Sequence, residues 1–297
     1  MADVTHILNW ADYPERFRLG LFKEWAEAGA EHLVLSGQLL GLCMTATANA
    51  RKLKSQIREA GMTFLDAHAL FGPWDDLCLP DESLRPIMLN RHRLALQACD
   101  LMEVRTCTIH VGNTSREYQN NDPETLIGYI TQSLEELLPT AERYGVTICI
   151  ENIWDPINGA DALLRQIRHF NHSPWLGICY DAGHANLIAN PVSDNRGAAC
   201  YQWLKVAGLA HVEWDGQLLD KLLPHIVNCH LHDNHGIEDE HLLPGEGNID
   251  WPTIMRKLAQ APRLQAIQNE TLQHAKNYSF AEQVRCFNRL KALMTTP

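Results

Sequence analysis

The chain alternates eight times between a short apolar run and a longer amphipathic segment. Short apolar runs bounded by turn residues indicate buried strands, whereas apolar residues spaced three or four positions apart indicate helices that bury one face. The predicted strands are residues 5–9, 32–36, 62–68, 104–111, 146–151, 176–181, 226–231 and 264–270. The predicted helices are residues 14–28, 48–60, 82–102, 123–144, 160–170, segments within 185–209, 251–259 and 280–293.

This order of elements predicts a (β/α)8 TIM barrel. Strands that alternate with helices form parallel βαβ units, and eight such units close into a barrel. The alternative is an open doubly wound sheet, which usually carries a glycine-rich phosphate loop after an early strand, and we find no such loop. The chain has 297 residues, and a typical barrel has about 250. One domain over residues 1–297 is therefore the simplest organisation.

Polar residues stand where the predicted strands end. Six consecutive strands, from the third to the eighth, finish on or beside a carboxylate or an imidazole: His68, His110, Glu151, Asp181 with His184, His230 with His232, and Glu270. A single such residue is commonly a solvated loop residue. Six of them at the same end of consecutive strands would converge at the mouth where barrel enzymes place their active sites. Carboxylates gathered there repel one another and lose hydration, and a divalent cation relieves both penalties. We therefore expect a metal site.

Smaller features of the sequence surround this expected site. Cys149 and Cys179 each precede a strand-end carboxylate by two residues, so they share its strand face and are expected to fill the barrel interior as small apolar groups. Trp10, Phe71 and Trp74 fall in or near loops at the same mouth. They are expected either to form a wall for substrate or to pack the loops.

Composition narrows the classes of function. The formal net charge of −11 disfavours broad binding to nucleic acid, which needs Lys and Arg against the phosphates. The nine cysteines include no CxxC pair, so neither a zinc ribbon nor a disulfide framework is indicated. The first residues lack the pattern of a signal peptide, and no apolar run approaches a membrane span of about 18 residues. A cytoplasmic protein with no membrane contact is expected.

Several motifs resemble the xylose isomerase-like barrel superfamily. They are HALFGPWDDL at 68–77, IEN at 150–152, YDAGH at 180–184 and HLHDNHGIEDEHLLPGEGNIDW at 230–251, and the resemblance covers roughly residues 62–271. The superfamily includes sugar phosphate isomerases and epimerases, and the resemblance implies one Mn²⁺ or Mg²⁺ ion. The implied ligands are Glu151, Asp181, His230 and Glu270. His232 is the rival histidine because it has the same strand parity.

The endonuclease IV group of the same superfamily adds an alternative. Its members bind three zinc ions through nine residues, and each has a counterpart here: His68, His110, Glu151, Asp181, His184, His230, Asp239, His241 and Glu270. The resemblance therefore also allows Zn²⁺, with more than one ion per chain. The same set occurs in sugar isomerase-like relatives, so it does not by itself indicate a nuclease.

The leading hypothesis is a sugar or sugar phosphate isomerase or epimerase. Glu151 and Glu270 are expected to act as base and acid on a metal-bound enediolate, while His184 orients a hydroxyl group. His232, Trp74 and Phe71 are expected to contact the substrate. The alternative is a phosphodiesterase on abasic DNA, which the acidic loop at 72–77 disfavours and for which Arg116 is a lone basic candidate. A non-catalytic sugar-binding barrel would be expected to lack one glutamate. The sugar, its phosphorylation and the oligomeric state stay open, although barrels often pair.

Overall fold

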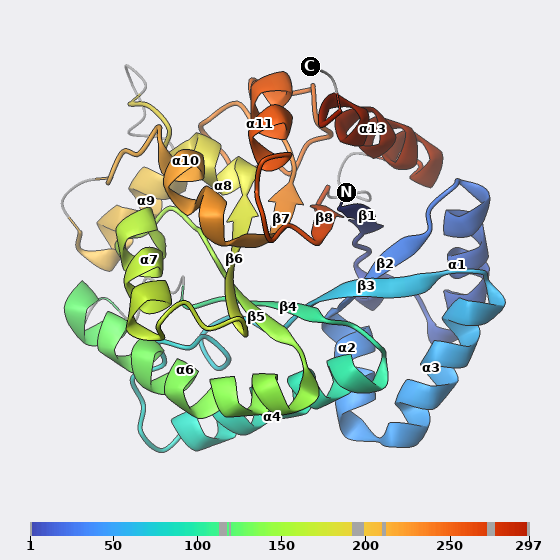
Figure 1. Cartoon of the computed structure of the whole chain (residues 1–297), viewed down its shortest axis with the longest axis horizontal. Helices are drawn as coiled ribbons and strands as arrows, with labels where there is room; N and C mark the ends of the chain where they lie inside the picture. Colours follow the sequence, from blue (N-terminus) through green and yellow to red (C-terminus); the bar gives the residue numbers. More distant parts are fainter. Residues whose placement is uncertain are drawn as a thin grey trace.

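Eight parallel strands form a closed barrel in the computed structural model, which describes residues 2–112, 118, 120–191, 199–209, 212–271 and 277–295 (Figure 1). Each strand pairs with the next along the chain, and β8 closes the barrel against β1. The strands are β1 (Asp3–His6), β2 (His32–Ser36), β3 (Thr63–His68), β4 (Thr106–Ile109), β5 (Thr147–Glu151), β6 (Leu176–Asp181), β7 (Ile226–Leu231) and β8 (Ala266–Asn269). The predicted TIM barrel is confirmed.

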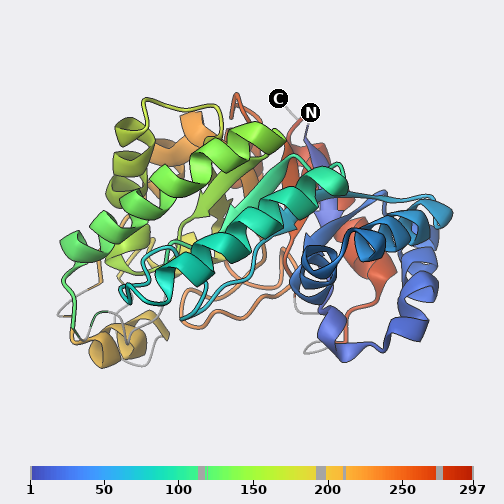
Figure 2. The same cartoon turned by 90° about the horizontal axis from the view of Figure 1, so that it is seen from below.

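Helices surround the barrel on its outside (Figures 1 and 2). The longer ones are α1 (Arg18–Glu27), α2 (Gly37–Thr45), α3 (Thr47–Glu59), α4 (Arg85–Leu101), α6 (Pro123–Tyr144), α7 (Ala160–His169), α9 (Ala199–Ala207), α11 (Trp251–Leu258) and α13 (Phe280–Leu293). Shorter ones are η1 (Trp10–Asp12), η2 (Glu15–Phe17), η3 (Pro156–Asn158), α8 (Ala182–Leu187), α10 (Leu218–Leu222) and η4 (Leu223–His225). Among the described residues, no helix has the length and hydropathy to cross a membrane.

Helix α6 shows how local sequence sets these elements. The Asp122 carboxylate accepts a hydrogen bond from the Thr125 backbone N–H at 2.7 Å and caps the first turn. Leu126, Ile130 and Leu134 recur every four residues and are buried against the barrel. Gly145 ends the helix with a φ of 63°, a conformation that costs glycine little. The bounds predicted from the sequence are those observed.

The interior of the barrel is unusually polar beneath the strand ends. Thr5, Asp66, Thr108, Asn228 and Gln268 are fully buried. Burial raises the pKa of Asp66 to about 7, although the nearby His230 opposes the shift. Cys149 and Cys179 pack with Val227 as small apolar groups, as predicted. This polar layer is consistent with a charged site directly above it.

Two elements near the N-terminus differ from the predictions. Strand β1 covers Asp3–His6 rather than residues 5–9, because the chain turns after His6 and buries Leu8 and Trp10 from a loop and a 3-10 turn. Helix α2 was not predicted. Its Gly37 and Gly41 lower helix propensity, but Leu39, Leu40 and Cys43 bury one face of it. Helix α2 therefore forms because of its tertiary packing, despite the low helix propensity of its glycines.

Candidate functional site

Four side chains from consecutive strands β5 to β8 meet at the C-terminal mouth of the barrel. Glu151 and Asp181 end β5 and β6, His230 is the penultimate residue of β7, and Glu270 follows β8 directly. His230 Nδ1 lies 3.3 Å from Glu151 Oε1 and 3.1 Å from Glu270 Oε2. The donor atoms of all four residues lie within 4.8 Å of one another. The structure thus brings the four predicted ligands together.

Each residue of this cluster has one buried polar atom without a hydrogen bond in the described part of the chain. Glu151 Oε2, Asp181 Oδ2, His230 Nδ1 and Glu270 Oε2 are buried and make no hydrogen bond of acceptable geometry within the described part of the chain. Buried polar atoms left unpaired are costly, and several around one point suggest a missing partner. Three carboxylates and one imidazole fit a divalent cation, and oxygen-rich sets favour Mn²⁺ or Mg²⁺ by ligand type.

The electrostatics of the cluster show that its acidic and basic side chains stabilise each other's charged forms. Burial opposes ionisation of Glu151, but His230 and His110 outweigh this effect and hold the pKa of Glu151 well below its usual value. Burial also opposes ionisation of Glu270, and His230 again reverses the effect and lowers the pKa. Protons on the histidines therefore neutralise the carboxylates, a role that a cation would take over.

Backbone carbonyls fix the orientation of three histidines around the cluster. The Nδ1 atoms of His68, His184 and His241 lie 2.9, 3.1 and 2.7 Å from the carbonyl oxygens of Ala69, Asn152 and Glu270. If each Nδ1–H donates to its carbonyl, each Nε2 keeps a lone pair directed into the site. Metal-binding histidines are commonly held in this way.

Two further clusters flank the four-residue group. On one side, Glu151 Oε2 lies 3.1 Å from His110 Nε2 and 3.8 Å from His68 Nε2. On the other side, Asp239 Oδ2 lies 3.5 Å from His184 Nε2 and 3.2 Å from His241 Nε2. All nine residues of the predicted set therefore gather at one mouth, although their roles stay predictions.

His232, the rival ligand, occupies a different place. It is fully buried, its Nε2 lies 3.2 Å from Asp181 Oδ2, and its ring stacks on His241 at 3.8 Å between centroids. A Cβ at position 183 would overlap this ring, so Gly183 is required beside it. His232 does not join the group that contains Glu151. The geometry therefore favours His230 as the ligand that completes the four-residue cluster.

Asp233 anchors the loop that carries Asp239 and His241. Its buried carboxylate accepts hydrogen bonds from the backbone N–H groups of Asn234, Gly245 and Ile249 at 3.0, 2.7 and 3.3 Å. It also accepts one from the Trp251 indole N–H at 2.7 Å. One side chain thus ties the start of the loop to its end. Sequence analysis did not single it out, because an acidic residue in a loop gives no sign of burial.

Replacing Asp233 should destabilise the protein strongly. Asp233→Ala leaves four donors without their acceptor, and we expect the free energy of unfolding to fall by roughly 3 kcal/mol. Asp250→Ala, at an exposed cap of α11, should cost only about 1 kcal/mol. Urea unfolding of both variants measures the difference. Equal losses in the two would show that Asp233 does not anchor the loop.

A cavity of about 410 Å³ opens beside the cluster. Its lining includes Trp10, Phe71, His68, His241 and Glu270. Phe71 is 62% exposed and its ring lies against His68 and His110. Such volumes are typical of small-molecule sites. The predicted contact residues Trp74 and His232 do not line this cavity, so their substrate roles stay predictions.

The loop at 72–77 opposes the approach of DNA less than its sequence indicated. Asp75 and Asp76 were expected to present negative charge in the loop at 72–77, but both are buried. Asp75 pairs with Arg91 at 3.0 Å, and Asp76 accepts a hydrogen bond from the Gly72 backbone N–H. The loop is therefore less acidic at its surface than its sequence indicates. Arg116, the basic candidate, lies outside the described residues.

Comparisons with known proteins agree with this architecture. An uncharacterised protein of Methanocaldococcus jannaschii is 27% identical over 70% of this chain and 64% of its own length, which is just under two thirds. The fold resembles that of a D-tagatose 3-epimerase-like protein, with a TM-score of 0.68, 23% identity and coverage of 91% and 90% of the two chains. It also resembles the 3-keto-D-glucoside 4-epimerase YcjR of E. coli, with a TM-score of 0.71, 17% identity and coverage of 98% and 100%.

A family model settles the family. The model for the xylose isomerase-like TIM barrel matches residues 22–283, which is most of the chain. The motifs that carried the resemblance lie within this range, and the observed barrel has the expected topology. The chain belongs to the xylose isomerase-like TIM barrel family.

Proposed function

We propose that the protein is a divalent-metal-dependent isomerase or epimerase of sugars or sugar phosphates. The observation that carries the proposal is the pair Glu151 and Glu270, whose oxygens flank the same His230 nitrogen at 3.3 and 3.1 Å beside the cavity. Two carboxylates of this kind can take a proton from one carbon and return it. When bound, a divalent cation supplies Lewis-acid polarisation of a carbonyl and makes the adjacent C–H more acidic.

In this proposal, Glu270 and Glu151 transfer the proton and His184 orients the substrate. Glu270 lines the cavity and is 15% exposed in its side chain, so it reaches a substrate there directly. Glu151 is 1% exposed and faces the same point from β5. Both pKa values are lowered, so both carboxylates are ionised at neutral pH. His184 would orient a hydroxyl group of the substrate.

Deuterium exchange tests this function. The Mn²⁺-loaded protein is incubated in heavy water with a panel of ketohexoses, ketopentoses and their phosphates, and NMR follows the carbons beside the carbonyl. The proposal expects deuterium to enter at one such carbon in at least one sugar. It fails if no sugar of the panel exchanges with Mn²⁺, Mg²⁺, Co²⁺ or Zn²⁺ present.

Cleavage of abasic DNA is a second candidate, because nine potential ligands surround the site. Clustered metals can generate hydroxide and hold a phosphodiester. However, the net charge of −11 opposes the approach of DNA. The residues that line the described cavity include no Lys or Arg. The nine potential ligands therefore permit this chemistry, whereas the net charge and the lining of the cavity disfavour it.

We predict that a duplex with one abasic site is cut weakly or not at all. The measurement is strand incision on a gel with Zn²⁺ or Mn²⁺ present, at about 0.05 and 0.15 M salt because low salt favours binding to phosphates. The intact duplex serves as the control substrate. Efficient incision that disappears in Glu151→Gln would replace the isomerase proposal.

A further inference from the structure

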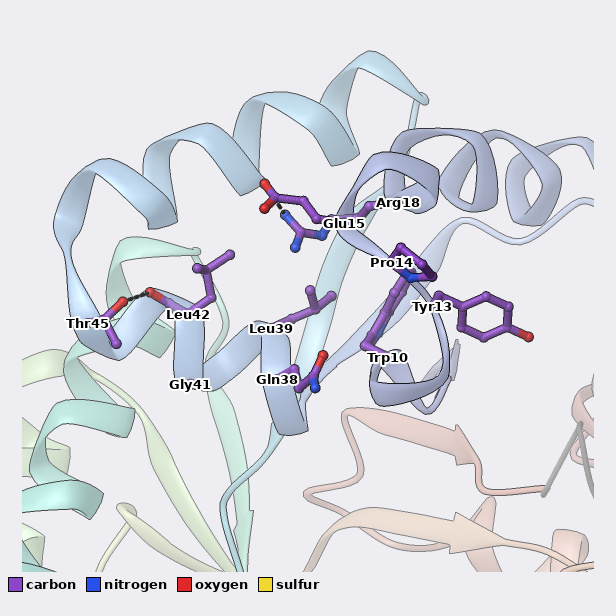
Figure 3. A pocket seen from close by; sticks show the side chains of 10 residues that line it. All are labelled: Trp10, Tyr13, Pro14, Glu15, Arg18, Gln38, Leu39, Gly41, Leu42 and Thr45. Atoms are coloured by element: carbon purple, nitrogen blue, oxygen red, sulfur yellow. Dashed lines mark hydrogen bonds and ion pairs between the residues drawn. The ribbon is translucent and has the colours of Figure 1, made fainter.

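A second cavity of about 380 Å³ lies next to the site cavity, between the loop that begins at Trp10 and helix α2 (Figure 3). Leu39 and Leu42 form its wall on α2, and Glu15 and Arg18 face them from the opposite side. The volume is similar to that of the site cavity. It lies within the range of small-molecule pockets, which begins near 300 Å³.

The two cavities meet at Trp10. This residue is 4% exposed and lines both of them. The chain also passes from one cavity to the other at the start of α2, since Gly37 lines the site cavity and Gln38 lines the second one. Apart from its chain neighbours and the backbone of its own helix, no heavy atom lies within 4 Å of the point where a Cβ of Gly37 would stand. The two cavities therefore adjoin at Trp10 and at the step from Gly37 to Gln38.

The second cavity offers an aromatic ring, aliphatic groups and several hydrogen-bonding groups. Arg18 is 11% exposed in its side chain and contacts Gln56 and Glu15 through Nη1 at 3.4 and 3.6 Å. Within the described part of the chain, its Nε and Nη2 have no partner and remain available as donors. Gln38 adds an exposed amide that can both donate and accept. An apolar wall with a few polar groups is the usual pattern of a ligand pocket.

The charges of this cavity favour a neutral ligand over a phosphate. Glu15 lies 3.6 Å from Arg18 and 3.2 Å from Lys52, so the guanidinium is balanced by a carboxylate. A phosphate is better held by cations that lack such a partner. Hydroxyl groups, by contrast, can donate to Glu15 and accept from Arg18. A polyhydroxylated ring with an apolar face suits the combination of these groups with Trp10.

We propose that the second cavity binds the second ring of a two-ring sugar, so that the substrate is a ketose bearing a glycosyl group. This inference rests on the proposed function, which places the reacting ketose beside Glu270. The glycosyl group would pass Gly37 and occupy the space between Trp10 and α2. Contacts there act on binding, because neither Glu151 nor Glu270 lines this cavity.

Gly41 provides a way to close the cavity without touching the site. It lines the cavity from α2, and a Cβ there would meet no heavy atom within 4 Å. Gly41→Phe should therefore fill the cavity without a backbone clash. Gly41→Ala is the matched control, since it adds only a methyl group at the same position of the same helix. Circular dichroism and thermal unfolding show whether both variants are folded.

The test compares the binding of one ring and two rings by titration calorimetry. The ligands are D-fructose, isomaltulose and lactulose, and the protein is loaded with Mn²⁺. In the wild type and in Gly41→Ala, at least one disaccharide should bind about tenfold more tightly than D-fructose. In Gly41→Phe this preference should disappear while D-fructose binds as before. The proposal is wrong if the disaccharides bind no more tightly than D-fructose, or if folded Gly41→Phe keeps the preference.

Deuterium exchange in the same samples separates this result from the proposed function. Loss of the preference in Gly41→Phe without exchange in any sugar would reject the isomerase chemistry and retain the two-ring pocket. Deuterium exchange into D-fructose with no preference for a disaccharide would support the isomerase chemistry and reject the two-ring pocket.

Discussion

Glu151→Gln and Glu270→Gln should each reduce turnover by about a hundredfold to ten-thousandfold. An amide keeps the shape of the side chain and one oxygen that can face the metal, but it cannot accept a proton from carbon. Substrate binding should change far less than turnover, because the lining of the cavity is otherwise intact. The measurement is the rate of deuterium entry beside the carbonyl of a responsive ketose, at saturating Mn²⁺ and with the metal content of each variant determined.

The two glutamates need not respond alike. Glu270 lines the cavity, whereas Glu151 lies deeper. An epimerase needs a group on each face of the enediolate, so one substitution can stop epimerisation and leave slow exchange on the other face. An isomerase that uses one face should show one glutamate dominating exchange. Glu246→Gln makes the same chemical change outside the cluster and should leave exchange intact. Unimpaired exchange in both single variants, with metal retained, would assign the proton transfer to another group such as His184.

The sequence predicted the barrel well because hydrophobic periodicity is a local property. The bounds of α6, β6, β7 and α13 agree with the predictions, since each element has a clear apolar pattern between turn residues or caps. The site could also be predicted from the sequence, because parallel strands bring their C-terminal ends to one mouth whatever the details of packing. Residues at the ends of six strands therefore had to meet.

The remaining features depend on contacts between distant segments. Helix α2 contains two glycines and forms because its apolar side chains find the core. Asp75 is buried beside Arg91 of α4, a partner that its own loop does not specify. The sequence also could not rank His230 against His232, since both point to the same side of one strand. The placement of Glu151 beside His230 separates the two.

Metal content should follow this distinction between the two histidines. His230→Ala removes a donor from the four-residue cluster, and Asp181→Asn replaces a charged carboxylate donor with a neutral amide. Changing a residue that only supports a ligand commonly costs about 10- to 100-fold in metal affinity, so losing a ligand should cost at least about a hundredfold. His232→Ala should keep one ion per chain at saturating Mn²⁺, with at most the smaller loss. Elemental analysis of the dialysed variants and Mn²⁺ titration measure both quantities.

The pH dependence of metal binding provides an independent check on His230. Burial disfavours its protonated form, but the carboxylates of Glu270 and Glu151 outweigh burial and hold the pKa of His230 well above its usual value. The metal-free imidazole therefore carries a proton at neutral pH, and a cation must displace it. Affinity for Mn²⁺ should rise with pH, by up to about tenfold per unit for one displaced proton, and binding should release protons into a weakly buffered solution.

The number of ions then separates the two candidate chemistries. One Mn²⁺ per wild-type chain, lost together with proton exchange in His230→Ala, agrees with a single centre at the four-residue cluster. Two or three Zn²⁺ per chain would indicate that His68 with His110, and Asp239 with His241, also hold ions, and would favour hydrolysis. Full metal occupancy in both Asp181→Asn and His230→Ala would remove the proposed centre altogether. The orphaned oxygens of Glu151 and Glu270 would then need another partner.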